Sequence, residues 1–329
     1  MEMAFSEISL VVFTAIAPAG AVGYVLMALV ARFARDAKVG ERADRFLVIP
    51  LLLALVGLIA SATHLGTPAN ALYVITGLGR SPLSNEVASA AAFLALGGAY
   101  WILAFPYRQR TAPKTALLVA SVTAAAAFVH FVSRAYAVES IVTWDNPIAP
   151  FTQWACAIAA GAMVALVGLR AARFPVGRKL AVALTAASAL AAVACVCLLA
   201  AELQIVSDMR TVTTNAADMA PLLTMQIGVF VVLAAAGIVC ACVNERRSGA
   251  SGEGRVEGEA ESARKTNAEA SAGARSSRVG RGTATASVNA GARSSLRALA
   301  LPIAATILLL AACFIVRFAF YAMYMTAGI

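Results

Sequence analysis

The sequence predicts an all-α membrane protein, a bundle of eight transmembrane helices with both termini outside the cell. Three observations support this prediction. Of the 329 residues, 61% are hydrophobic and the mean hydropathy is +0.81. Eight apolar segments approach the roughly 20 residues that a helix needs to cross a bilayer. Lys and Arg gather in alternate connections. A soluble domain is excluded, because helices that are apolar on all sides must be covered by lipid or by one another.

The eight segments contain almost no charged residues, so each is predicted to cross the membrane as one helix. We expect seven of them within residues 1–243 and the eighth within residues 298–329, all in a single membrane domain. Small residues are frequent in them, which predicts a tightly packed bundle. The segments are Ile8–Val30, Phe46–Thr63, Glu86–Phe105, Thr115–Tyr136, Phe151–Leu169, Leu180–Ala201, Leu222–Val243 and Ala298–Met325.

The orientation follows from the connections between these segments. The first, third, fifth and seventh connections hold 22 of the 26 Lys and Arg residues, whereas the even connections hold only Arg80, Arg134 and Arg210. Basic connections stay on the cytoplasmic side of a membrane, so the odd connections are predicted to face the cytoplasm. The net charge of +9 then indicates anionic lipid headgroups as partners and gives no support for nucleic acid.

The seventh connection, residues 244–297, has a different composition. It is rich in Gly, Ala, Ser, Glu and Arg and contains no aromatic residue, which is typical of a disordered segment. We therefore expect a disordered cytoplasmic insertion. It is either a passive linker or a segment that its ten basic residues hold near an anionic leaflet.

The six cysteines all lie inside apolar segments, and we interpret them as small core residues. Metal ligation is the alternative, but Cys-x-x-Cys spacing and neighbouring His residues are both missing. We therefore expect no metal site on this chain, and any iron–sulfur cluster is expected on a partner. The cysteines are Cys156, Cys195, Cys197, Cys240, Cys242 and Cys313.

Ionisable residues at membrane depth are costly and are therefore functional candidates. Five such residues occur in the apolar segments or at their ends, and all five fall toward the predicted outer ends of their helices. There they could enclose one polar pocket. Tyr321 lies one turn after the arginine of the last helix, so the phenol and the guanidinium share a helix face. The five candidates are His64, Glu86, Arg134, Glu202 and Arg317.

Two of these candidates keep an alternative interpretation. Glu86 follows Ser84 and Asn85, both good helix N-caps, and the helix dipole favours a carboxylate in a first turn even without a ligand. His64 opens a connection rich in Gly and Pro, where an imidazole is either a solvated loop residue or a proton acceptor. Arg317 lies among apolar and aromatic residues and needs a counter-ion or a polar ligand.

The connection between the second and third segments resembles the signature connection of the dimethyl sulfoxide reductase membrane anchors, the DmsC family. It contains His64-Leu65-Gly66-Thr67-Pro68 and, at the family's spacing, Gly79-Arg80-Ser81-Pro82-Leu83-Ser84-Asn85-Glu86. Further likeness is found in Arg134-Ala135-Tyr136 leading to Thr143-Trp144, in Ala201-Glu202-Leu203, in Arg317 with Phe320-Tyr321, and in Met325-Thr326-Ala327-Gly328.

The resemblance implies a multi-pass anchor in the cell (inner, cytoplasmic) membrane that serves anaerobic respiration. Such an anchor holds a molybdopterin catalytic subunit and an iron–sulfur electron-transfer subunit, and it oxidises menaquinol without haem or an iron–sulfur cluster of its own. Terminal reduction takes place on the partner subunit. The resemblance associates His64 and Glu86 with the quinol site, and we expect Arg134, Glu202, Arg317 and Tyr321 to complete the pocket.

In the mechanism we expect, neutral His64 accepts a quinol proton and Glu86 passes protons to the outer water. A transporter is the alternative of another class, but it predicts a polar site at mid-membrane and helices broken by Gly or Pro. A purely structural anchor without a quinol site is a third hypothesis. Two departures from the family are the long insertion and His130, which with His64 makes a bis-His haem geometrically conceivable.

Overall fold

The computed structural model describes residues 2–63, 74, 76–105, 111–137, 141–209, 222–271 and 284–325. Side chains are described for these residues except 2–3 and 248–298. His64, Arg210 and the arginines between Phe105 and Thr111 therefore lie outside the described residues.

Every regular element in the described residues is a helix, as predicted. The helices are α1 (Glu2–Ser6), α2 (Ile8–Arg32), α3 (Ala37–Arg45), α4 (Val48–Ala62), α5 (Pro82–Leu103), α6 (Ala112–Ala135), α7 (Ala149–Ala171), α8 (Arg178–Asp208), α10 (Leu223–Ser271) and α11 (Ala284–Ala322). Eight stretches in this part of the chain are long and apolar enough to cross a membrane, with α3 and α4 forming one of them. This number confirms the prediction from the sequence.

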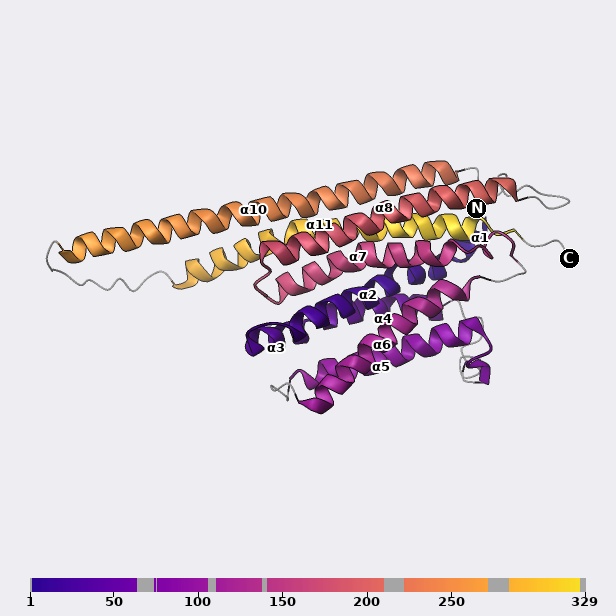
Figure 1. The fold of residues 1–329 in the computed structure, drawn as a ribbon, viewed down its shortest axis with the longest axis horizontal. Coiled ribbons are helices and arrows are strands. Elements are labelled where there is room, and N and C mark those ends of the chain that lie inside the picture. Colours follow the sequence, from indigo (N-terminus) through magenta and orange to yellow (C-terminus); the bar gives the residue numbers. More distant parts are fainter. Residues whose placement is uncertain are drawn as a thin grey trace.

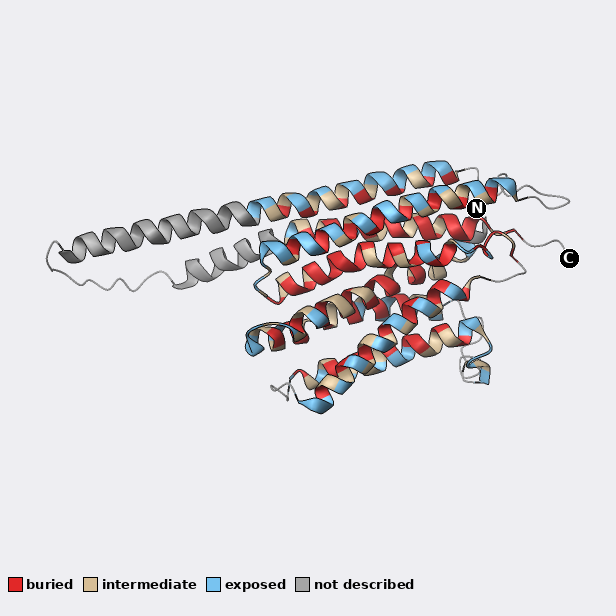
Figure 2. Cartoon of the chain, viewed as in Figure 1, coloured by how far each residue is buried: buried red, intermediate tan, exposed pale blue. Residues whose placement is uncertain are grey.

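The long helices lie side by side as one bundle (Figure 1). We call the end where α2 begins and the last turn of α11 ends the terminal end. Helices α2 and α7 are the most buried spans and pack against each other, with α4, α6 and α11 also contacting α2. Figure 2 shows this burial as nearly continuous red along α7. These two helices therefore form the centre of the bundle.

Glycines allow the central helices to approach one another closely. A Cβ atom on Gly20 of α2 would lie 2.7 Å from the Pro50 carbonyl oxygen and 2.8 Å from the Ala54 nitrogen of α4. A Cβ atom on Gly161 of α7 would lie 2.7 Å from the Val22 Cβ of α2. Lipid tails are as apolar as the helices, so helices in a membrane associate through such tight packing.

We expect Gly20→Ala to destabilise the protein, because its new methyl group meets backbone atoms of α4 that cannot move aside. The same change at Gly98 of α5 meets no atom within 4 Å, so it is expected to raise stability by roughly 0.5–1 kcal/mol through helix propensity. Unfolding in detergent measures both changes. Equal effects of the two substitutions would contradict the close α2–α4 approach.

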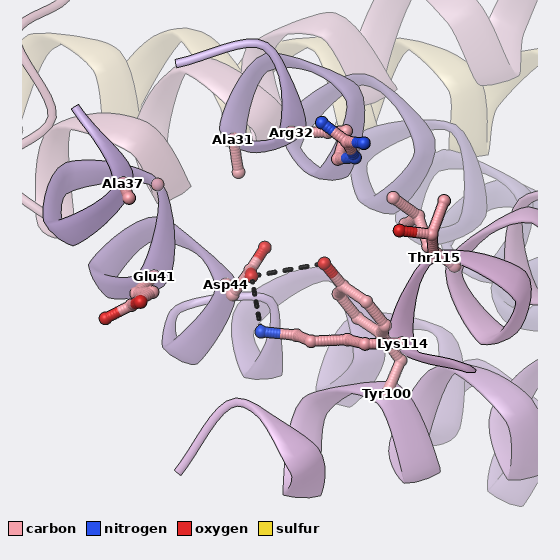
Figure 3. A pocket seen from close by; sticks show the side chains of 10 residues that line it. Ala31, Arg32, Ala37, Glu41, Asp44, Tyr100, Lys114 and Thr115 are labelled. Carbon is pink, nitrogen blue, oxygen red and sulfur yellow. Dashed lines mark hydrogen bonds and ion pairs between the residues drawn. The ribbon is translucent and has the colours of Figure 1, made fainter. Parts of the chain in front are cut away.

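The end of the bundle opposite the terminal end contains a buried ion pair that was not predicted (Figure 3). The Asp44 carboxylate of α3 accepts hydrogen bonds from Lys114 Nζ of α6 at 3.2 Å and from the Tyr100 hydroxyl of α5 at 3.1 Å. The Lys114 ammonium also lies 5.4 Å from the centre of the Tyr100 ring. All three side chains are buried, so this contact ties α3 to the α5–α6 pair.

Replacing Lys114 by Met is expected to lower the free energy of unfolding by roughly 3–5 kcal/mol, because it removes a positive charge 3.2 Å from the buried Asp44 carboxylate. The double variant Lys114→Met with Asp44→Asn should recover much of that loss. Lys38→Met, on the exposed surface of α3, serves as the control. Unfolding of the four proteins in one detergent provides the comparison, and a Lys114→Met protein as stable as the control would contradict a structural role for the pair.

Helical backbone extends into the insertion, residues 244–297, from both of its ends. Helix α10 continues to Ser271 and α11 begins at Ala284, so the backbone of these parts of residues 244–297 is helical. The side chains of residues 248–298 lie outside the described part of the chain. Disorder of the insertion stays a prediction.

Candidate functional site

The terminal end of the bundle holds four of the six residues predicted for a ligand pocket as buried side chains. Glu86 and Tyr321 are fully buried, and Glu202 and Arg317 are each 3% exposed. They come from the first turns of α5 and the last turns of α8 and α11. Arg134, at the end of α6, is exposed, and His64 lies outside the described residues.

The Glu86 carboxyl group is not used to cap its helix. Helix α5 is capped by Ser81, whose hydroxyl oxygen accepts a hydrogen bond from the Ser84 nitrogen at 3.4 Å. Both Glu86 carboxyl oxygens are buried and make no hydrogen bond of good geometry. Burying a carboxyl group without such a partner costs a few kcal/mol. This cost argues against a purely structural role for Glu86.

Arg317 is held by α2 and by aromatic rings of its own helix. Its Nε donates a hydrogen bond to the Thr14 hydroxyl oxygen at 3.2 Å. Its Cζ lies 4.2 Å from the centre of the Phe320 ring and 5.5 Å from that of Tyr321. Cation–π contacts of this kind stabilise a guanidinium that has lost its water.

The charge of Arg317 acts on two carboxyl groups from different helices. It interacts electrostatically with Glu86 of α5 and with Glu202 of α8. Neither carboxyl group forms a direct ion pair with it among the described residues. The guanidinium is thus the shared counter-charge of two acids that it does not bind directly.

Two tyrosine hydroxyls complete the surroundings of Glu86. The rings of Tyr136, at the end of α6, and Tyr321 lie 5.5 Å apart and nearly perpendicular. Both hydroxyl oxygens are buried without a hydrogen bond of good geometry. The Tyr136 hydroxyl nevertheless lies close enough to interact with the Glu86 carboxyl group and with the Tyr321 hydroxyl, and the Tyr321 hydroxyl lies close to that of Thr14. A tyrosine hydroxyl is protonated at neutral pH. Both hydroxyls are therefore available as donors.

Glu202, on the other side of Arg317, has a defined partner. Its Oε1 accepts a hydrogen bond from Asn146 Nδ2 at 3.1 Å. Asn146 also caps α7, because its Oδ1 accepts from the Ile148 and Ala149 nitrogens at 2.9 and 2.8 Å. One side chain therefore fixes both the start of α7 and the position of the Glu202 carboxyl group.

A narrow pocket, here called the Glu202 pocket, lies beside these residues between α7, α8, α10 and α11. It is small, because the centre of a water molecule can occupy only about 10 Å³ of it, which is roughly room for one water. Its lining is apolar apart from Thr152, Glu202 and Arg317. Arg317 therefore faces a cavity as well as the cluster around Glu86.

A short segment, Ile141–Ile148, covers the terminal end of α11. The Val142 nitrogen donates to the Met325 carbonyl oxygen at 3.1 Å, and Trp144 Nε1 donates to the Phe320 carbonyl oxygen at 2.9 Å. The Trp144 ring stacks on Phe320 with centroids 5.1 Å apart. These contacts place the Trp144 ring against Phe320 and Tyr321, an arrangement here called the aromatic cover.

Sequence reasoning did not identify Thr14, Tyr136 and Asn146 as members of the site. Thr14 is one hydroxyl within an apolar run, and nothing distinguishes it before α11 is placed beside α2. Tyr136 carried a signal, because it is a polar aromatic residue at the end of an apolar segment and follows Arg134. Asn146 lies inside a connection, and its position in the sequence does not distinguish it.

The cysteines are not all in the core of the bundle. Cys156, Cys195 and Cys313 are buried, but Cys197 and Cys242 are exposed on the outside of the bundle, so the prediction that all six are core residues is wrong for these two. Their segments are apolar on every side, so composition could not indicate the lipid-facing side. His130 is also exposed. The described residues contain no group of three potential metal ligands.

Comparisons with known proteins agree with this architecture. The family model described as DMSO reductase anchor subunit (DmsC) matches residues 1–251. The sequence is 31% identical over 175 residues to the YnfH subunit of an anaerobic dimethyl sulfoxide reductase of Escherichia coli, which is 53% of this protein and 61% of the relative. It is 32% identical over 147 residues to the C subunit of the E. coli anaerobic dimethyl sulfoxide reductase, 44% of this protein and 51% of the relative.

The C subunit of the anaerobic dimethyl sulfoxide reductase from Haemophilus influenzae is 27% identical over 154 residues, 47% of this protein and 54% of the relative. The matched regions thus span about half to three fifths of these relatives' lengths. The family match covers well over half of the present sequence and includes seven of the eight apolar helices. With these helices, this multi-pass membrane protein belongs to the DMSO reductase anchor subunit (DmsC) family.

Proposed function

We propose that this protein oxidises menaquinol at the terminal end of its bundle and passes the electrons to an iron–sulfur partner subunit. The observation that carries the proposal is the set of buried polar atoms without well-formed hydrogen bonds, namely both Glu86 carboxyl oxygens and the hydroxyls of Tyr136 and Tyr321. Buried polar groups in a protein normally find a hydrogen-bond partner. A bound ligand with hydroxyl groups supplies the missing ones.

The chemistry of these atoms fits a quinol. Each quinol hydroxyl is a donor and an acceptor. A carboxylate can accept its hydrogen and then its proton, and a tyrosine hydroxyl can donate to its oxygen. Arg317 stabilises negative charge that develops on the ring oxygen as the proton leaves.

The proposed pocket keeps the residues expected from the sequence and gains Tyr136 and Thr14. His64 is proposed as the first proton acceptor, and Glu86 as the group that passes protons to water at the terminal end. Glu202 balances Arg317 and lines the adjoining Glu202 pocket. Arg134, being exposed, is assigned to the rim.

The direction of proton release depends on orientation. The basic odd connections favour a terminal end that faces outward from the cytoplasmic membrane, so protons would leave on that side. Electrons would pass to the nearest cluster of the iron–sulfur subunit, and a molybdopterin subunit would reduce the terminal acceptor. The anionic leaflet at the opposite end would attract the basic connections.

Glu86→Gln, which keeps size but removes the base, is expected to lower menaquinol-dependent turnover at least about 100-fold. Electron delivery from a dye that reduces the partner subunits directly should remain normal. Both activities are measured in membranes that contain the complex.

Asp145→Asn is the matched control, because Asp145 is an exposed carboxylate at the same end of the bundle. Unchanged quinol turnover in the Glu86 variant would favour a purely structural anchor. Loss of both activities would be traced to assembly by measuring how much of the partner subunits remains in the membrane.

Tyr321→Phe is expected to raise the apparent KM for the quinol roughly fivefold, the equivalent of one lost hydrogen bond of about 1 kcal/mol. Stability should fall only slightly, because the hydroxyl lies near Tyr136 and Thr14 but makes no protein hydrogen bond of good geometry. Tyr324→Phe, whose ring also packs on Trp144, controls for the aromatic cover. A KM that does not move, or a clear drop in melting temperature, would show that the hydroxyl serves the fold instead.

A further inference from the structure

A proline in α2 leaves a backbone carbonyl group near Arg317 without its usual partner. Pro18 lies inside α2, and a proline has no N–H to donate to the carbonyl group four residues before it. That carbonyl group belongs to Thr14, whose hydroxyl oxygen accepts the hydrogen bond from Arg317 Nε. Pro18 and Thr14 are both buried. Inside a membrane bundle the carbonyl oxygen therefore needs a donor from another helix.

Gln153 of α7 supplies that donor. Its Nε2 donates a hydrogen bond to the Thr14 carbonyl oxygen at 2.8 Å, and the residue is only 2% exposed. Its Oε1 is buried and makes no hydrogen bond of good geometry. Burying an unpaired amide oxygen costs free energy, so an apolar side chain would suit this position better if Gln153 served packing alone. The contact that the position requires is the one from Nε2 to α2.

The Thr14 side chain connects this contact to Arg317. Its hydroxyl group donates to the Leu10 carbonyl oxygen at 2.8 Å, and its oxygen accepts from Arg317 Nε at 3.2 Å. A threonine side chain is stiff about χ1, so the backbone of α2 determines where the hydroxyl oxygen lies. One series of hydrogen bonds therefore runs from α7 through α2 to the guanidinium on α11.

We propose that Gln153 is a positioning residue for quinol oxidation, an inference that rests on the proposed function. Gln153 holds the carbonyl group that Pro18 leaves without an intrahelical donor, and through Thr14 it sets the place of Arg317. In the proposed reaction the guanidinium stabilises negative charge that develops on the ring oxygen as the proton leaves. The neutral quinol in its ground state carries no such charge. A displaced guanidinium therefore slows the reaction more than it weakens quinol binding.

Gln153→Leu keeps the approximate size of the side chain and removes the donor. In membranes that contain the intact complex, it is expected to lower kcat for menaquinol about 10-fold with little change in KM, because the lost interaction acts mainly in the transition state. Electron delivery from a dye that reduces the partner subunits directly should remain normal. Gln226→Leu, the same change at a buried amide near the start of α10, is the control and should leave kcat unchanged.

A second substitution tests whether Gln153 acts through the Thr14 carbonyl group. Pro18→Ala restores an N–H that can donate to this oxygen within α2. The double variant Pro18→Ala with Gln153→Leu should therefore recover most of the lost kcat, a non-additive result expected of two residues that share one partner. Pro302→Ala changes a proline inside α11 and is the matched control. Combined with Gln153→Leu, it should give no recovery.

A kcat that Gln153→Leu leaves unchanged would overturn the inference. A loss that Pro18→Ala does not restore, or that Pro302→Ala restores equally well, would overturn it too. If the Gln153 variant does not assemble, Thr14→Val takes its place, because it removes only the hydroxyl group that accepts from Arg317. It should lower kcat in the same way, and an unchanged kcat would again contradict the inference.

Glu86→Gln, measured in the same membranes, separates this inference from the proposed function. Turnover that depends on Glu86 but not on Gln153 would leave the proposed function standing and remove the positioning role. Turnover independent of Glu86 would remove both.

Discussion

A guanidinium inside an apolar bundle is the constraint on which the terminal end of this protein depends. An unpaired charge at membrane depth is costly, and Arg317 is only 3% exposed. The fold meets this cost with the Thr14 hydroxyl, the Phe320 ring and the fields of two carboxyl groups. Helices α2, α5, α8 and α11 all contribute, so the position of one charged group fixes how four spans are rotated toward one another.

Each end of the bundle contains a buried carboxyl group, Asp44 at one end and Glu86 at the other, and the two have different surroundings. Asp44 has a direct ion pair with Lys114 and a hydrogen bond from Tyr100. Glu86 has a nearby positive charge but no hydrogen bond of good geometry to either oxygen. The first arrangement holds the carboxylate with a direct counter-charge, as structural ion pairs do. The second has no direct ion pair among the described residues, which agrees with the ligand-binding role proposed for Glu86.

Helix number and the depth of the charged groups could be predicted from the sequence, because both depend only on position along the chain. Each apolar run needs the length of a span, and the direction of each helix then brings Glu86, Glu202 and Arg317 to one end. Contacts depend instead on the rotation of each helix about its axis. Uniformly apolar spans do not encode that rotation in their composition, so the role of Thr14 and the contacts that Tyr136 makes emerged only from the structure. The Asp44–Lys114 pair was missed for a different reason, since both residues belong to basic connections that suggest solvent.

Leaving polar atoms unpaired costs roughly 1–3 kcal/mol for each group, so the protein must hold them in place by other means. The close packing of α2 against α4 and α7, made possible by Gly20 and Gly161, supplies a rigid centre on which Thr14 is fixed. Trp144 and its segment hold the end of α11 from the other side. The Glu86 carboxyl group and the Tyr136 and Tyr321 hydroxyls are thereby held close to one another without well-aligned hydrogen bonds. In the proposed function this rigidity keeps the three groups available to the quinol hydroxyls, because a softer bundle would let them align with one another instead.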